Sequence, residues 1–248
     1  LLDNGVVFIT ATLTDGDGDS AKASVDLAGL VAFEDDGPAI SVVSQHGQTL
    51  LVDETVRGAG DEDIASAWAT GKGTVLGYDT ATAAALFVTS GTGSDGGATA
   101  YSLTAANGAA LANGTASGLF DAVNNQQIYL YVNAQGEVEG RVGSGGAADP
   151  TGAVSFVIRV SGGTLEMAQY RAVEHNDSND HDEALSPELL DNGVVFVTAT
   201  ITDGDGDTAK ASVDLAGLVA FEDDGPVIDV VSQHGETLRV DETVRGAG

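Results

Sequence analysis

Hydrophobic and polar residues alternate with a period of two along most of the chain. Between residues 6 and 14, Val7, Ile9, Ala11 and Leu13 fall on one face and threonines fall on the other. This period, with β-branched residues, is typical of a half-buried β-strand. The same alternation predicts further strands at residues 21–27, 128–132, 138–142, 154–160 and 165–167.

The spacing of these strands predicts the fold class. Turn segments at residues 133–136 and 161–163 separate them, and no helices alternate with them. We therefore expect an all-β fold made of antiparallel β-sandwich modules, immunoglobulin-like or larger, in tandem. Two segments, 61–69 and 117–123, are expected to be short helices. The glycine-rich segments at 91–97 and 143–146 are expected to be loops.

An internal repeat sets the domain organisation. Residues 1–60 recur at 189–248 with an offset of 188. Seven positions differ, namely Ile9/Val197, Leu13/Ile201, Ser20/Thr208, Ala39/Val227, Ser41/Asp229, Gln48/Glu236 and Leu51/Arg239. Such a repeat is typical of a tandem array. We expect residues 1–33 to be the C-terminal hairpin of a preceding repeat, residues 34–221 one full repeat, and residues 222–248 the start of the next.

Charge and composition narrow the function class. A formal net charge of −29, from 38 acidic and 9 basic residues, argues against a nucleic-acid ligand and against electrostatic docking on anionic lipid. A hydrophobic fraction of 42% argues against disorder. Because the chain has no cysteine, it has no disulfide framework, thiol nucleophile or zinc–thiolate site. No apolar run approaches the roughly 18–20 residues that span a bilayer. No signal peptide is visible in the sequence, and we expect the chain to be a piece of a longer protein.

Acidic residues are concentrated in loops, at a spacing that predicts calcium binding. Close carboxylates repel without a counter-ion, and Ca²⁺ accepts six to eight oxygen ligands in a flexible geometry. The predicted ligands are Asp15, Asp17 and Asp19 with their copies Asp203, Asp205 and Asp207, Glu34, Asp35 and Asp36 with their copies Glu222, Asp223 and Asp224, Asp53 and Glu54 with their copies Asp241 and Glu242, and finally Asp61 and Asp63. The alternative is that these acids are solvated turn residues that serve solubility.

Two other calcium motifs do not fit this sequence. An EF-hand loop starting at Asp15 would place Ser20 where glycine is required, and strands flank the loop where helices should. A glycine- and aspartate-rich nonapeptide β-roll would need a repeated G-G-x-G-x-D run, which is absent.

The acidic segment before Pro38 is expected to form a calcium joint between units. We predict that Glu34, Asp35 and Asp36 hold Ca²⁺ together with Asp53 and Glu54. The same joint is predicted for the copies, namely Glu222, Asp223, Asp224, Asp241 and Glu242. The alternative is an ordinary flexible linker.

A third polar cluster lies at residues 175–183, and three interpretations stay open. It is a solvated acidic loop, a further calcium site, or a transition-metal site that uses His175 and His181. The calcium ligands would be Asp177, Asp180 and Asp182.

Four motifs together resemble a known family across essentially the whole chain. They are Phe33–Pro38, Leu51–Glu54, Tyr170–His175 and Thr202–Asp207. This set is similar to the tandem extender repeat of giant type I-secreted RTX adhesins, which are biofilm-associated surface proteins of Gram-negative bacteria. The resemblance implies Ca²⁺-stabilised β-sandwich modules that are exported unfolded, fold outside the cell and place a distal ligand-binding region away from the membrane.

The expected function is therefore structural. The chain would be a calcium-rigidified spacer of a cell-surface adhesin, and its partners would be the neighbouring repeats of the same chain. The alternative is a glycan- or peptide-binding module. We do not expect an enzyme, because the sequence has no nucleophile elbow, no phosphate loop and no Ser–His–Asp grouping.

Overall fold

The computed structural model describes residues 1–43, 47–54, 66–89, 91–176 and 186–223, and it confirms the all-β sandwich. Its strands make several sheets, most of them antiparallel. Its helical segments are one turn of α-helix, α1 (Ala67–Thr70), and the 3₁₀ turns η1 (Ala83–Leu86) and η2 (Ala106–Gly108). No helix in this part of the chain is both long and apolar enough to cross a membrane.

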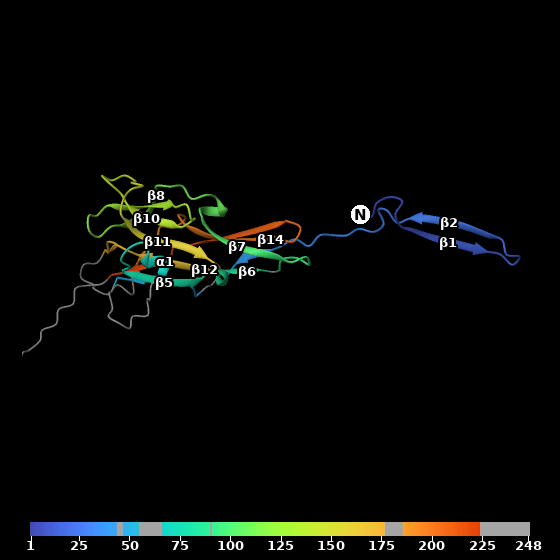
Figure 1. The fold of residues 1–248 in the computed structure, drawn as a ribbon, viewed down its shortest axis with the longest axis horizontal. Helices are drawn as coiled ribbons and strands as arrows, with labels where there is room; N and C mark the ends of the chain where they lie inside the picture. The colour runs from blue at the N-terminus through green and yellow to red at the C-terminus, as the bar shows by residue number, and fades with distance from the viewer. Residues whose placement is uncertain (44–46, 55–65, 90, 177–185, 224–248) are drawn as a thin grey trace, which may run out of the picture.

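A six-stranded antiparallel sheet forms one layer of the sandwich (Figure 1). Residues alternate between buried and partly exposed along its strand β9, as the period of two predicts. In sheet order its strands are β5 (Gly77–Thr82), β12 (Thr164–Gln169), β11 (Val154–Ser161), β10 (Val138–Val142), β9 (Gln127–Val132) and β8 (Thr115–Phe120).

Smaller sheets pack against this layer. They are β13 (Glu188–Leu189) with β16 (Val219–Glu222) and β4 (Leu50–Asp53), β15 (Thr208–Asp214) with β14 (Phe196–Asp203) and β7 (Gly97–Thr104), and β3 (Ile40–Val42) with β6 (Phe87–Thr89). The rings of Phe156 on β11 and Phe221 on β16 meet across the core with centroids 5.2 Å apart. Both side chains are fully buried, so the two layers share one hydrophobic core.

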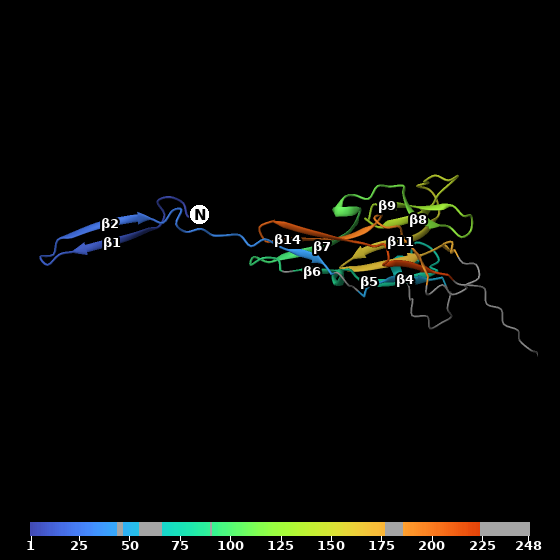
Figure 2. The same ribbon diagram turned by 180° about the vertical axis from the view of Figure 1, so that it is seen from behind.

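The hairpin of β1 (Phe8–Thr14) and β2 (Ser20–Asp26) stands apart from this sandwich in both views (Figures 1 and 2). The segment 27–39 connects it to β3. Every residue of β1 is exposed, although its sequence alternates like that of a half-buried strand. The unit from β3 to β16 therefore contains the core, and the first hairpin lies outside it.

Two expectations about secondary structure need correction. Residues 117–123 contain strand and turn where a short helix was predicted, because Gly118 has a φ of +87° that an α-helix does not contain. For the other predicted helix, residues 61–65 lie outside the described residues, and α1 begins at Ala67.

One strand pair departs from the antiparallel pattern. Strands β4 and β16 pair in parallel, with Asp53 opposite Glu222. Parallel neighbours need a long connection. Here nearly the whole unit supplies that connection, because β4 lies near its start and β16 near its end.

Candidate functional site: an acidic cluster at the linker end

The turn between β14 and β15 forms the base of the site. The amide of Asp203 donates to the carbonyl of Asp207 at 3.1 Å. The amides of Gly206 and Asp207 donate to Asp203 Oδ1 at 3.0 and 2.7 Å. Gly206 has a φ of +103°, which glycine tolerates and which allows this tight turn. The turn therefore presents Asp203, Asp205 and Asp207 from five consecutive residues.

The most direct indication of a bound cation is the side chain of Asp203. Only 6% of this residue is exposed. Its Oδ2 atom is buried and has no hydrogen-bond partner among the described residues. Leaving a buried charged oxygen unpaired is costly. A cation bound to this oxygen would remove the cost, because no donor of the described protein is hydrogen-bonded to the atom when the neighbouring carboxyls are ionised.

Strand β7 adds a fourth carboxylate. It pairs antiparallel with β14, and the last pair of the ladder is Asp203 with Gly97. Asp95 lies two residues before Gly97, and one of its oxygens is within 4.8 Å of ligand oxygens on both Asp203 and Asp205. The register of the sheet therefore positions Asp95.

The linker adds a fifth carboxylate. Strand β3 pairs antiparallel with β6, and Ile40 lies opposite Thr89. The linker before β3 therefore runs beside the loop after β6. Glu34, Asp35 and Asp36 line a cavity of about 290 Å³ there, together with Ser94, Asp95 and Asp205. The ligand oxygens of Asp35, Asp205 and Asp207 also lie within 4.8 Å of one another.

These residues form two overlapping triads, which we call the linker-end cluster: Asp35, Asp205 and Asp207, and Asp95, Asp203 and Asp205. Asp205 belongs to both. A hydrogen bond to Asp203, available only when one of the two carboxyls is protonated, raises the pKa of Asp205, and the charges of Asp203 and Asp35 raise it further. The same kind of hydrogen bond to Asp35 raises the pKa of Asp207. The cluster is therefore repulsive when fully ionised without a counter-ion.

Glycine at two positions allows the segments to approach each other. A Cβ atom on Gly204 would lie 2.6 Å from Asp95 Oδ2 and 2.7 Å from the Asp95 carbonyl oxygen. A Cβ atom on Gly93 would lie 2.4 Å from the carbonyl oxygen of Asp36. Both distances are shorter than a van der Waals contact, so the sequence needs glycine here for the cluster to close.

Replacing Gly204 with alanine is expected to push the Asp95 loop away and to destabilise the unit by about 1–3 kcal/mol. The reason is the short distance from the new Cβ atom to the carbonyl oxygen of Asp95, because a backbone atom cannot rotate away as a side chain can. Thermal unfolding in calcium measures the effect. The matched control is Gly16→Ala in the first copy of the turn, where a Cβ meets nothing within 4 Å. A loss of the same size in both variants would contradict the proposed crowding.

The first copy of the turn is an incomplete version of this cluster. Ligand oxygens of Asp15, Asp17 and Asp19 also lie within 4.8 Å of one another, and all three residues are exposed. The Asp19 amide donates to Asp15 Oδ1 at 3.0 Å. In the described part of the chain no further acid joins this group of three.

Asp53 and Glu54 lie elsewhere than the joint prediction placed them. Asp53 ends β4 and Glu54 follows it, and β4 lies on the side of the sandwich away from the entering linker (Figure 2). There Asp53 lies opposite Glu222, the last residue of β16. The structure thus separates Asp53 and Glu54 from Glu34–Asp36 and brings them to the copy of that segment. The physical reason is the parallel β4–β16 pair, which no local pattern specifies.

Glu54 is held by protein donors. It is 9% exposed, and its Oε1 accepts from the amide of Val173 at 2.8 Å and from Gln169 Nε2 at 2.5 Å. Burial raises its pKa, these two hydrogen bonds oppose the rise, and the charge of Asp223 adds to it. Part of the ligand capacity of Glu54 is therefore used within the fold.

Several predicted ligands lie outside the described residues. They are Asp61, Asp63, Asp177, Asp180, Asp182, Asp224, Asp241 and Glu242. Of the proposed transition-metal pair, His181 also lies outside them.

Basic side chains do not neutralise the linker-end cluster. Four ion pairs are seen among the described residues, and their acids are Glu137, Glu139, Glu166 and Asp121. None of these acids was predicted as a metal ligand. Within the described structure, none of these four ion pairs includes a carboxylate of the linker-end cluster.

Asp95 is not among the ligands that the sequence predicted. It lies in the glycine-rich segment 91–97, which was interpreted only as a loop. A lone Asp-Gly pair is common in turns, so nothing local distinguishes it from a solvated residue. Its role depends on the β7–β14 register, which pairs residues about a hundred positions apart.

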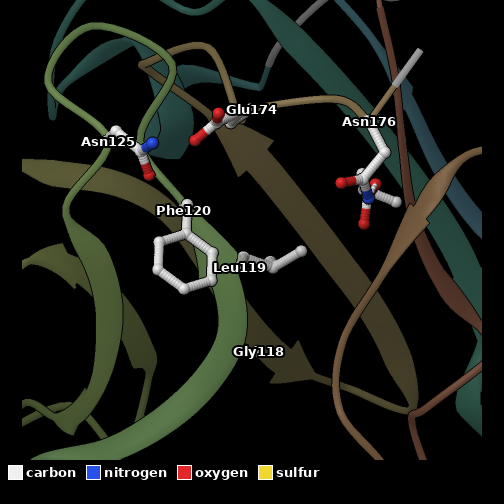
Figure 3. Close-up of a pocket in the computed structure, with 7 residues that line it drawn as sticks. Gly118, Leu119, Phe120, Asn125, Glu174 and Asn176 are labelled. Atoms are coloured by element: carbon white, nitrogen blue, oxygen red, sulfur yellow. Dashed lines mark hydrogen bonds between the residues drawn. The ribbon is translucent and has the colours of Figure 1, made fainter.

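A separate cavity of about 270 Å³ lies at the end of β8. Phe120, which is 40% exposed, lines it together with Asn125 and Glu174 (Figure 3). Asn176 donates a hydrogen bond to Glu188, which also borders the cavity. This site combines an exposed aromatic ring with several polar groups.

Comparison with known proteins gives one family. No curated protein and no solved structure matches the chain. The family model described as a domain of unknown function, DUF5801, matches residues 49–216, which run from just before β4 to just after β15. Because this match covers more than half of the sequence, the chain belongs to the DUF5801 family.

Proposed function

We propose that this chain is a calcium-stabilised spacer of a long, repetitive cell-surface adhesin. In this role the β-sandwich unit supplies length, and cations bound between segments supply stiffness. The parent protein would be exported by type I secretion and would act outside a Gram-negative cell, as its resemblance to extender repeats implies. The unit itself performs no reaction.

The observation that carries the proposal is the shared carboxylate cluster of linker and unit. Asp35 belongs to the segment that joins the first hairpin to the sandwich, whereas Asp205 and Asp207 belong to the sandwich. An ion between them would connect the linker to the body of the unit. A linker that is tied in this way bends less, which is the property that a spacer needs.

The ligand chemistry favours Ca²⁺ among common cations. All side-chain ligands of the cluster are carboxylates, and they come from three separate segments. Ca²⁺ accepts six to eight oxygens in flexible geometry, whereas Mg²⁺ requires a near-ideal octahedron. The buried Oδ2 of Asp203 provides a position where a cation replaces a missing hydrogen-bond donor.

Calcium is expected to stabilise the chain, and a chelator to remove the effect. Extracellular sites bind calcium with dissociation constants of about 10⁻⁴–10⁻³ M. At about 100 times the dissociation constant, one such site adds about 2.7 kcal/mol. For a domain of this size, the thermal midpoint then rises by about 5–11 °C. Thermal unfolding and calorimetric titration with Ca²⁺ and with Mg²⁺ measure this.

Asp203→Asn is the decisive variant, because it removes the charge of the buried oxygen and keeps the shape. It should remove most of the calcium response. Asp15→Asn is the matched control in the exposed first copy and should change the response much less.

Small-angle scattering on the same samples tests the spacer role. Calcium should narrow the distribution of distances between the first hairpin and the sandwich, and Asp35→Asn should cancel the narrowing. An unchanged midpoint after chelation would refute the calcium site.

A glycan- or peptide-binding role is the second candidate. It is favoured by the cavity beside Phe120, where an exposed ring lies next to amide and carboxylate groups (Figure 3). Such cavities combine an apolar surface with a few placed polar groups. Saturable binding of a saccharide or peptide that Phe120→Ala abolishes, with or without calcium, would favour this role over the spacer.

A further inference from the structure

The first hairpin presents an uncovered apolar face. Ile9, Leu13 and Val25 point to one side of β1 and β2 and are 62%, 76% and 58% exposed. Phe33, which follows the hairpin, is 78% exposed. Neighbouring exposed apolar side chains of this kind mark an interaction surface.

The same hairpin occurs a second time in the chain, and there its face is covered. Strands β14 and β15 repeat β1 and β2 in sequence and in register, since Phe8 lies opposite Asp26 and Phe196 lies opposite Asp214. In this copy Val197 and Ile201 are fully buried. Phe221, the copy of Phe33, is also fully buried.

The apolar face of the second copy packs into the hydrophobic core, and two further contacts hold its β14 edge. Strand β14 pairs with β7 over eight residue pairs, from Phe196 with Thr104 to Asp203 with Gly97. The hydroxyl of Thr198 lies 2.7 Å from the hydroxyls of both Thr104 and Ser212. In the first hairpin the pair Thr10–Ser24 is present at 2.8 Å, but no third hydroxyl is hydrogen-bonded to Thr10 among the described residues. The first hairpin therefore has the residues that β14 and β15 contribute to the interface with β7, but it does not pair with a third strand among the described residues.

We infer that the β1–β2 hairpin is a docking surface whose partner is strand β7, with the core behind it, in another copy of this unit. In that other copy, the β1–β2 hairpin would occupy the position that the β14–β15 hairpin has in the present sandwich. The differences at the interface are small, since Ile9 replaces Val197 and Leu13 replaces Ile201. The offset of 188 also fixes the order along the chain. A copy of residues 34–188 placed directly before Leu1 has the same sequence order as residues 34–221.

Docking would also complete the first acidic turn. In the second copy Asp203 and Asp205 meet Asp95, which lies beside β7. The docked hairpin would bring Asp15 and Asp17 to the Asp95 of the partner copy. This part of the inference rests on the proposed calcium function, whereas the apolar contact and the strand pairing do not depend on it.

The test compares this 248-residue chain with an extended chain that carries residues 34–188 of the same sequence before Leu1. Amide hydrogen exchange is measured in both, in calcium and in chelator. In the 248-residue chain, β1 and β2 should exchange at least about 100-fold faster than β14 and β15. In the extended chain the two hairpins should be similarly protected. If β1 and β2 are protected both in calcium and in chelator, the docking is supported and a contribution of calcium to it is contradicted. If they are protected in calcium but not in chelator, the docking and the calcium contribution are both supported.

A pair of variants separates docking from general destabilisation. Leu13→Asp places a charge on the docking face and should leave the thermal midpoint of the 248-residue chain unchanged, while it unfolds the added unit in the extended chain. Lys22 lies on the opposite face of the hairpin, so Lys22→Gln should leave the thermal midpoints of both chains unchanged. If β1 and β2 stay unprotected in the extended chain, the inference is wrong, whether or not the added unit folds without them.

Discussion

Replacing Phe221 with alanine is expected to lower the free energy of unfolding by about 3–5 kcal/mol. Phe221 is fully buried, and its ring lies 5.2 Å from that of Phe156 between the two layers of the sandwich. Removing it deletes both the apolar burial and the contact across the core, and it leaves a cavity that the rigid strands cannot fill. For a domain of this size, the thermal midpoint should fall by about 6–20 °C. Reversible denaturant unfolding, followed by circular dichroism, gives the free energy directly.

The repeat supplies a matched control for this variant. Phe33→Ala makes the same chemical change at the equivalent position of the first copy, where the residue is 78% exposed. It should change the free energy of unfolding by no more than about 0.5 kcal/mol. Similar losses in the two variants would mean that Phe33 has a core of its own in this chain, which would contradict the described position of the first hairpin.

The second large effect is expected at the ion pair of Arg171 and Asp121. The side chain of Asp121 is fully buried, and it accepts from Arg171 Nε at 2.8 Å and from Nη2 at 3.0 Å. Both oxygens of the carboxylate are thus satisfied by one guanidinium group. Arg171→Ala would leave a buried charge without its partner and should cost about 3–5 kcal/mol. Thermal and denaturant unfolding at neutral pH measure this loss.

The control for Arg171→Ala must account for the strongly negative net charge of the chain. Lys210→Ala removes the same positive charge from an exposed residue of β15 and should cost no more than about 0.5 kcal/mol. A large loss in both variants would show that overall charge repulsion dominates. A negligible loss in Arg171→Ala would show that Asp121 finds another partner or is hydrated.

The local parts of the fold could be predicted from the sequence. A period of two determines which residues form strands, because successive side chains of a strand point to opposite faces. The predicted strands at residues 128–132, 138–142 and 154–160 are confirmed as β9, β10 and β11. The hairpin register is also local, since both copies of the Asp-Gly turn give the same pairing. The repeat was visible without any structure.

The candidate site was predictable only in part. The turn acids Asp203, Asp205 and Asp207 were predicted as one group because they alternate with glycine within five residues, and the structure brings them together. The structure also places Asp35 with this group and places Asp53 elsewhere. These last placements follow from pairings between β3 and β6 and between β4 and β16, whose partners are far apart in the chain.

The sequence by itself determined the strand pattern, the two equivalent hairpins and the acidic turns, because each depends on residues within a few positions of one another. Only the tertiary structure decided which copy is buried, which acids meet and where Asp95 lies. Ile9 and Val197 occupy equivalent positions in near-identical sequence, yet one is 62% exposed and the other is fully buried. The physical reason is that burial and ligand geometry depend on the surface that a hairpin packs against. Among the described residues, only the second copy pairs with β7 and packs into the core.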